Sequence, residues 1–216
     1  MSDDDLDDLI RRVDPDRWLS SRFIGDAGRR ADVIAIYAYD HELARAPKVA
    51  SNPLLGEIRL TWWREALDEI YEDRHVRHHP TAQALADVVK RHGLPREPLE
   101  AMIDARYREL DATPMSDEDA VAWARGTAGR AAEVAVRLLD PAANGAAALS
   151  AGAAWALDRK GLAKAGGGEL GIARAAVAGL SAAAFPAVAH AALIGRAESE
   201  FRRRVALTWA VARGRI

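Results

Sequence analysis

The stretch of residues 37–72 constrains the fold of this 216-residue chain most strongly. A stripe at helical spacing leads into it and carries an aliphatic group, a phenol, an acid and a methyl group, at Val33, Tyr37, Asp40 and Ala44. Asn52 and Pro53 then suit a helix start, as the N-cap and the first helical residue. We therefore predict two helices joined by a short break, at 29–49 and 53–72.

The second predicted helix carries a broad apolar stripe that Arg59 interrupts. Its apolar members are Leu55, Ile58, Trp62, Trp63, Ala66 and Ile70. An acid on one stripe and an arginine on the next are either a mutual buried pair or part of a site. Because an unpaired buried charge is costly, we favour Asp40 as the partner of Arg59 or of an arginine from another helix over a metal ligand.

The rest of the chain also reads as helical. Half of the residues are hydrophobic but only 6% are aromatic, a composition that favours close helix packing over sheets. Ser116 and Asp119 form a capping signature for a long helix to Leu139, in which Gly126 and Gly129 share a face that suits a close helix crossing. The glycine-rich residues 165–170 are expected to form a loop.

We therefore expect one all-α domain over residues 1–216, a helical bundle of about eight helices. Residues 1–13 form an acidic N-terminal segment and residues 140–216 an Ala-rich C-terminal part. In the last helix, the i+4 spacing of Phe201, Val205 and Trp209 predicts a packed helix with a basic outer face rather than a membrane anchor.

Charge and residue usage exclude several functions. A net charge of −2 argues against nucleic-acid binding, and the lack of cysteine excludes thiolate chemistry and disulfides. His75, His78 and His79 either lie in a solvated turn or ligate a metal; the turn is favoured because no acid or cysteine completes the set. No signal peptide or membrane span is expected, so we predict a cytoplasmic protein, peripheral at most to the inner membrane.

Four segments resemble the squalene/phytoene synthase family: "IYAYDHELAR", "LLGEIRLTWWREALDEIY", "IDARYREL" and "ARGTAGRAAEVAVRLL". The resemblance runs from about Asp14 to about Leu139. It implies an isoprenoid-synthase-like fold of helices around a central cavity. It further implies two Asp-rich motifs that bind Mg²⁺, which in turn binds the diphosphates of prenyl substrates.

The chain departs from this pattern at both motifs. The resemblance places the first at residues 43–46, which read Leu-Ala-Arg-Ala, and the second in a region where Asp158 is the one acid before Glu169. The chain is also shorter than a typical synthase. We therefore expect a truncated fold without catalytic residues, metal or cofactor: a pseudoenzyme that resembles the branch of the family that assists respiratory complex I assembly.

The alternative is an active, Mg²⁺-dependent prenyltransferase with a reduced carboxylate set, in which Asp40, Glu42, Glu109 and Arg64 surround one diphosphate. Trp62 and Trp63 either pack in the core or line a prenyl-sized cavity. Arg64 and Asp68 either form a solvated pair, or Arg64 binds a phosphate. For Arg45 and Arg106, the sequence favours neither a surface position nor a position in the cavity. A protein partner or a membrane surface is expected, and a prenyl or lipid ligand is possible. The candidate substrate or lipid cavity comprises Tyr37, Asp40, Glu42, Arg45, Arg59, Trp62, Trp63, Arg64, Arg106 and Glu109.

Overall fold

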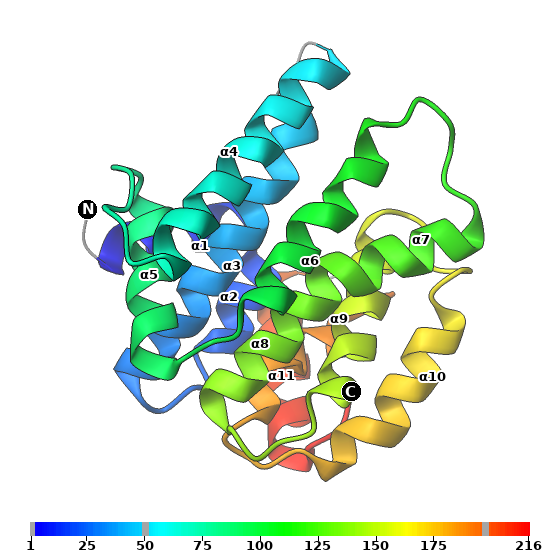
Figure 1. The fold of residues 1–216 in the computed structure, drawn as a ribbon. Coiled ribbons are helices and arrows are strands. Elements are labelled where there is room, and N and C mark those ends of the chain that lie inside the picture. The colour runs from blue at the N-terminus through cyan, green and yellow to red at the C-terminus, as the bar shows by residue number, and fades with distance from the viewer. Residues whose placement is uncertain (1–2, 49–51, 196–198) are drawn as a thin grey trace.

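A computed structural model describes residues 3–48, 52–195 and 199–216, and the fold in these ranges is all-α (Figure 1). The α-helices are α1 (Asp3–Val13), α2 (Pro15–Ser21), α3 (Ala27–Lys48), α4 (Pro53–Tyr71), α5 (Pro80–His92), α6 (Arg96–Tyr107), α7 (Asp117–Ala124), α8 (Arg130–Leu139), α9 (Gly145–Arg159), α10 (Gly167–Ala176) and α11 (Glu200–Arg213). Short helical turns are η1 (Arg108–Leu110), η2 (Arg125–Gly129), η3 (Val177–Gly179), η4 (Phe185–Ala187) and η5 (Ala189–Leu193).

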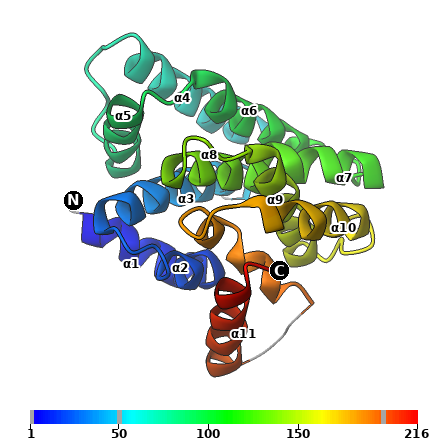
Figure 2. The ribbon, with the colours of Figure 1, turned by 90° about the horizontal axis from the view of Figure 1, so that it is seen from below.

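The helices form three layers when the molecule is seen from below (Figure 2). α3, α8 and α9 make the middle layer, α4, α6 and α7 cover one side, and α1, α2 and α11 lie on the other. α3 contacts α4, α5 and α6 as well as α1 and α2, so it joins the outer layers. The helix predicted around Tyr37 is therefore the centre of the fold.

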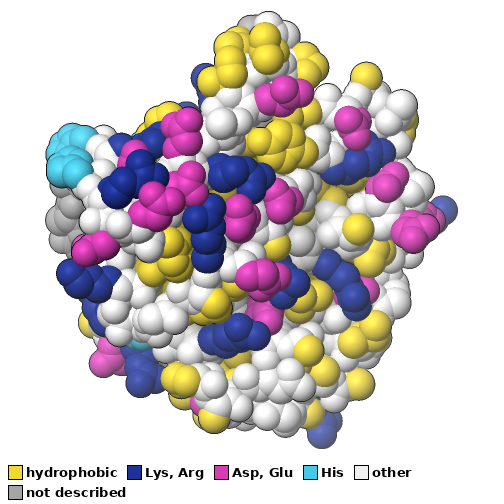
Figure 3. Space-filling model, in the orientation of Figure 1, with side chains coloured by type: hydrophobic (Ala, Val, Ile, Leu, Met, Phe, Trp, Pro, Cys, Tyr) yellow, Lys and Arg dark blue, Asp and Glu magenta, His cyan; other side chains and the backbone are white. Residues whose placement is uncertain are grey.

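Surface charges on the α4 and α6 side are mostly paired, and acidic and basic side chains alternate across this face (Figure 3). Arg64 of α4 binds Glu100 and Asp104 of α6 at 2.8 and 2.5 Å. The start of α4 is different, because Leu54, Leu55 and Ile58 are exposed there. Only the later part of the predicted apolar stripe of this helix is therefore packed.

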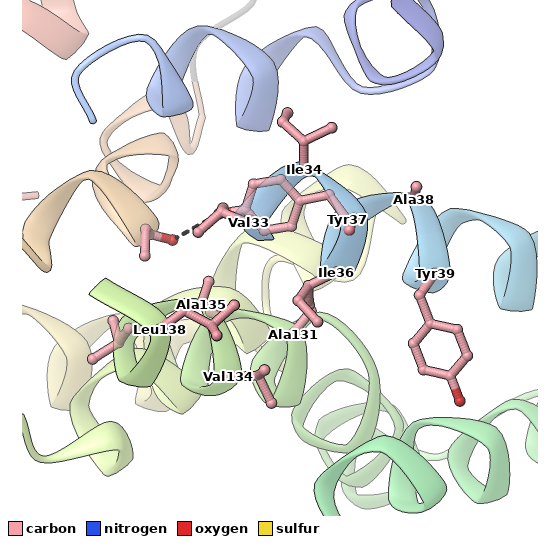
Figure 4. Close-up of a cluster of buried hydrophobic side chains, with 14 of the residues drawn as sticks. Val33, Ile34, Ile36, Tyr37, Ala38, Tyr39, Ala131, Val134, Ala135 and Leu138 are labelled. Carbon is pink, nitrogen blue, oxygen red and sulfur yellow. Dashed lines mark hydrogen bonds between the residues drawn. The ribbon is translucent and has the colours of Figure 1, made fainter. Parts of the chain in front are cut away.

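α3 is buried on every side from Asp32 to Asp40, which exceeds the single buried face predicted for it. Ile36 points toward Ala131 of α8, and Tyr39 points away from that helix (Figure 4). The hydroxyl of Tyr39 donates to the carbonyl of Leu99 at 3.0 Å, and that of Tyr37 donates to the carbonyl of Ala187 at 3.3 Å. The two phenols thus bind backbone on opposite sides of α3 and fix its rotation.

The predicted helix starts are confirmed. The side chains of Asp14 and Asn52 cap α2 and α4, and both have proline at the first helical position. Ser116 and Asp119 form a complete capping box at α7. The long helix predicted to follow is interrupted by a π-helical turn, η2. This interruption is one reason why the structure has more helical segments than the sequence predicted.

Two sequence predictions about glycine need comment. Close helix approach at the two glycines is confirmed, but they face two helices rather than sharing one face. A Cβ on Gly126 would lie 2.5 Å from Ala105 of α6, and one on Gly129 would lie 2.8 Å from the carbonyl oxygen of Leu149 in α9. The predicted loop at 165–170 is wrong in its second half, because α10 begins at Gly167. Three successive glycines weaken helix propensity, but packing of the following residues against α9 overrides it.

Candidate binding site

Three helices bring five charged side chains together beneath the surface, and we call them the buried charge cluster: Asp14, Arg17, Asp40, Arg106 and Glu109. Asp40 of α3 accepts a hydrogen bond from Arg106 of α6 at 2.7 Å, and its other oxygen lies 2.8 Å from an Nη atom of Arg17 in α2. Asp40 is only 2% exposed and each arginine 5%. Both oxygens of this carboxylate are therefore occupied by guanidinium groups.

The ends of the cluster are occupied in the same way. Arg17 also binds Asp14, the N-cap of its own helix. Glu109 accepts hydrogen bonds from Arg106 at 2.6 Å and from the indole of Trp123 at 2.9 Å on one oxygen, and from Lys160 at 3.2 Å on the other. The acids and bases thus alternate along a continuous chain that runs from α2 to α9.

Aromatic rings surround the arginines. The guanidinium carbon of Arg17 lies 4.8 Å from the ring centres of both Tyr37 and Trp155, and Lys160 lies 4.5 Å from that of Trp123. The faces of such rings attract cations, so these contacts offset part of the cost of burying charge.

The charges of the cluster control the ionisation of Asp40. Burial alone would raise the pKa of this carboxyl, but the positive charges and hydrogen bonds of Arg106 and Arg17 outweigh burial and lower its pKa. Burial and the neighbouring Arg106 oppose each other in the same way at Glu109, whose pKa is also lowered. Both acids are therefore anionic at neutral pH and act as counter-ions.

A cleft of about 390 Å³ opens beside the cluster. Five cationic side chains and three acidic ones line it, together with apolar and aromatic groups. Nη1 of Arg17 and Nε of Arg106 are buried and have no hydrogen-bond partner among the described residues. The cleft therefore offers an excess of positive charge, which suits an anionic group.

A second pocket of about 390 Å³ lies on the other side of α3, and we call it the tryptophan pocket. Trp62 and Trp63 pack edge to face, with ring centres 4.9 Å apart, and His79 packs against both at 5.4 and 5.2 Å. Its lining residues are Glu42, Arg45, Ala46, Arg59, Trp62, Trp63 and His79. Burial lowers the pKa of His79, so this imidazole is neutral at neutral pH.

The structure distributes the predicted cavity residues over three places. Asp40, Arg106 and Glu109 belong to the cluster, and Tyr37 lies against Arg17. Arg64 lies at neither pocket and binds α6 instead. The other five predicted residues line the tryptophan pocket: Glu42, Arg45, Arg59, Trp62 and Trp63.

Helix geometry explains this division. Successive residues are about 100° apart around a helix, so Asp40 and Glu42 point in nearly opposite directions. Ala44, four residues after Asp40, faces the cleft with it, whereas Arg45 binds Glu42 at 2.9 Å beside the other pocket. The carboxylate set proposed for one diphosphate, which combined Asp40 with Glu42 and Arg64, is therefore not brought together.

Of the two kinds of partner predicted for Asp40, the structure shows arginines from other helices, Arg17 and Arg106. Arg59 is not its partner, because that side chain is exposed on α4. Sequence reasoning missed Arg17, Lys160 and Trp155. No local pattern joins Arg17 to residue 40, because the contact depends on how α2 packs on α3. Trp155 carried a usable signal as the one large side chain in an Ala-rich helix.

The side chains of the cluster do not fit a magnesium ion. Mg²⁺ requires carboxylate oxygens that are free to coordinate, and both oxygens of Asp40 and of Glu109 already bind cationic or N–H groups. Within the described ranges, no group of three or more His, Asp or Glu side chains could hold a metal ion. The predicted metal alternative at His75, His78 and His79 finds no such group either.

Comparisons with known proteins agree with the sequence motifs. The family model described as squalene/phytoene synthase matches residues 10–158, which include the cluster from Asp14 to Glu109. The chain belongs to the squalene/phytoene synthase family. A crystal structure of a dehydrosqualene synthase in complex with a ligand superposes with a TM-score of 0.72 over 97% of this chain and 95% of that one, at 14% identity. This likeness shows the fold, and relative to that chain the expected truncation is not seen.

The curated proteins that this chain resembles include assembly factors. Complex I assembly factor 6 proteins of Bos taurus and Homo sapiens are each 33% identical over 104 residues. The match covers 48% of this chain and 31% of theirs, so the matched part of the chain spans about a third of the length of these relatives. No helix in the described ranges is long and apolar enough to cross a membrane.

Proposed function

We propose that this member of the squalene/phytoene synthase family is non-catalytic and acts as a scaffold or assembly factor for respiratory complex I. The observation that carries the proposal is the pairing of Asp40 with Arg17 and Arg106. Prenyl condensation requires Mg²⁺ to stabilise a departing diphosphate, and that ion needs carboxylate ligands. Here the central carboxylate is already neutralised by the protein itself.

Energetics support the same conclusion. For Mg²⁺ to bind Asp40, at least one arginine would have to give up its contact with this carboxylate and remain buried, with Asp14 or Glu109 as its remaining acid. Breaking a buried ion pair in this way costs about 3–5 kcal/mol. A metal site at this position would therefore compete with the stability of the fold. Similarity to complex I assembly factor 6 supports a role in complex I assembly instead of catalysis.

Genetic complementation tests the assembly role. Deletion of the gene in the organism that encodes it should lower the amount of assembled complex I on native gels and the NADH:ubiquinone oxidoreductase activity of membranes. Wild-type protein and the surface variant Asp104→Asn should both restore them. Intact complex I in the deletion strain would contradict the proposal.

A second candidate function is binding of a prenyl diphosphate, with or without condensation. The observation that favours it is the excess of cationic over acidic side chains around the cleft, five against three. Calorimetry with farnesyl or geranylgeranyl diphosphate, with and without Mg²⁺, separates the candidates when combined with product analysis. Release of diphosphate with a condensed product would overturn the non-catalytic proposal. Binding without turnover, unaffected by Mg²⁺, would agree with a retained cavity.

A further inference from the structure

The C-terminal helix α11 is attached to the rest of the protein by one narrow face. Leu207 and Ala210 are buried, and the helix packs against η5 and α2. Arg203 forms an ion pair with Asp16 of α2, which lies under the helix and is only 4% exposed. These contacts fix both the position and the rotation of α11.

The opposite face of α11 carries the stripe that the sequence led us to expect in the interior. Phe201 is 74% exposed, Val205 40% and Trp209 57%. They follow one another at i+4 steps, so they form a single line along the helix. The expectation that this stripe packs is therefore wrong, because Leu207 and Ala210 serve the interior instead. Exposed aromatic residues in such a line are unusual on a water-facing surface.

Arginines flank this apolar line. A groove of about 750 Å³ runs beside it. Its lining among the described residues contains four arginines and no acid: Arg174, Ala191, Ala192, Ile194, Phe201, Arg202, Val205, Ala206, Trp209, Ala210, Arg213, Arg215 and Ile216. Arg213 lies over the ring of Trp209, 4.5 Å from its centre. This differs from the surface of α4 and α6, where arginines are paired with acids.

The line of apolar residues and its four arginines define what we call the α11 face. We propose that the α11 face docks on the surface of a membrane that contains anionic phospholipids. A helix that lies in the membrane interface has aromatic and aliphatic residues on one side and Lys or Arg beside them. Tryptophan favours the level of the lipid headgroups, and each nearby arginine is attracted to the negative surface.

Charge complementarity decides for an anionic surface over a second copy of the chain. Among the residues that the structure describes, the four arginines of this groove meet no acid in it, so a second copy that brought the same face would add repulsion. The position of the helix also suits a flat surface. α11 lies at the edge of the molecule farthest from α4, α6 and α7, and extends away from the body (Figure 2). The inference does not depend on the proposed function.

Vesicle binding tests the proposal on the full chain. Sedimentation with phosphatidylcholine vesicles is compared with sedimentation with vesicles that also contain about 30% phosphatidylglycerol, which gives their surface a negative potential. We expect at least tenfold tighter binding to the anionic vesicles, and weaker binding as salt is raised. Lipids brominated near the headgroup should quench Trp209, measured as the difference between wild type and Trp209→Phe.

Two double variants distinguish binding through the α11 face from nonspecific binding through any exposed apolar side chains. Phe201→Ser with Trp209→Ser should lower vesicle binding at least tenfold with an unchanged melting temperature, because both side chains are exposed. The matched control is Leu54→Ser with Ile58→Ser at the start of α4, where the side chains are 62% and 54% exposed and lie outside the groove of the α11 face. This control should bind vesicles like the wild type.

Four results would overturn the proposal. The first is equal binding of the wild type to neutral and anionic vesicles. The second is equal loss in the α4 control, and the third is vesicle binding that survives both serine substitutions in α11. A concentration-dependent dimer that the α11 variant abolishes would identify a second copy as the occupant and would equally contradict a lipid surface.

Discussion

At the scale of single residues, Asp40 shows how the same acid can serve chemistry or structure. Its helix is the one that bears the metal ligands implied by the family resemblance, but here two arginines from other helices satisfy both of its oxygens. A carboxylate held in this way has a lowered pKa and no free coordination position. The identity of its neighbours, rather than of the acid itself, determines its role.

Replacing Asp40 with Asn should therefore destabilise the protein strongly. The substitution leaves two buried guanidinium groups without their shared counter-ion, and we expect a loss of about 3–5 kcal/mol in the free energy of unfolding. Asp104→Asn makes the same chemical change in a pair on the surface, where the acid side chain is 60% exposed. There the loss should be at most about 1 kcal/mol. Urea unfolding measures both, and equal losses would contradict the structural role of Asp40.

His190 should make stability depend on pH. It is buried against Trp155, with ring centres 5.2 Å apart, and burial together with the charge of Arg17 lowers its pKa to about 3. The unfolded chain takes up this proton near pH 6.5, the folded chain only near pH 3. Stability is therefore complete above pH 6.5 and falls as pH decreases toward 3, by about 1.4 kcal/mol at pH 5.5 from this residue.

Two glutamine variants distinguish the contribution of His190 to the pH dependence of stability from that of the carboxylates. The carboxylates titrate in the wild type and in both variants. His190→Gln should lose less stability than the wild type between pH 7 and pH 5.5, measured as the difference in urea unfolding free energy. His75→Gln, at an imidazole exposed to solvent, should follow the wild type. Identical pH slopes in wild type and His190→Gln would refute the assignment.

At the scale of secondary-structure elements, glycine has two opposite roles in this protein. In α9, Gly152 lets the helix approach η2 so closely that a Cβ would lie 2.3 Å from the carbonyl oxygen of Ala128. In α10, Gly171 faces open space. Both lie inside helices, where alanine would be preferred by about 1 kcal/mol on propensity alone. Packing decides which of them is required.

Alanine substitutions should separate these roles. Gly152→Ala should destabilise the protein by about 1–3 kcal/mol, because the new methyl group meets backbone that cannot move aside without separating the helices. Gly171→Ala should stabilise it by up to about 1 kcal/mol. Thermal and urea unfolding measure both changes. Stabilisation by Gly152→Ala would show that α9 and η2 are not packed as described.

At the scale of the whole molecule, one apolar core extends from Leu6 in α1 to Ala210 in α11. A smaller cluster joins α7, η2 and α9. The main core includes residues of the Ala-rich part from 140 onward, such as Phe185 and Leu193. The charge cluster crosses the same boundary, because Glu109 of η1 binds Lys160 at the end of α9.

We therefore expect the chain to unfold as one unit. In urea, the transition seen by far-UV circular dichroism should coincide with that seen by tryptophan fluorescence, because the tryptophans lie both before and after residue 140. Pulse proteolysis along the transition should show loss of the full-length chain without a stable fragment. An earlier transition of residues 140–216 would contradict the prediction of a single domain.

The sequence by itself determined the helices and their starts. Periodicity, N-caps and the capping box act within one or two turns, so they can be read from neighbouring residues, and they placed α2, α3, α4 and α7 correctly. The motifs also sufficed for the family. The π-helical turn and the start of α10 were missed because packing overrode local propensity there.

Only the tertiary structure decided which side chains meet. Asp40 is 66 residues from Arg106, and their contact depends on the rotation and crossing of α3 and α6 rather than on local pattern. Packing of the helices likewise buries Leu207 while Phe201 and Trp209 face the solvent. A helical stripe in the sequence records that a helix has an apolar side; where that side faces is set by the other helices.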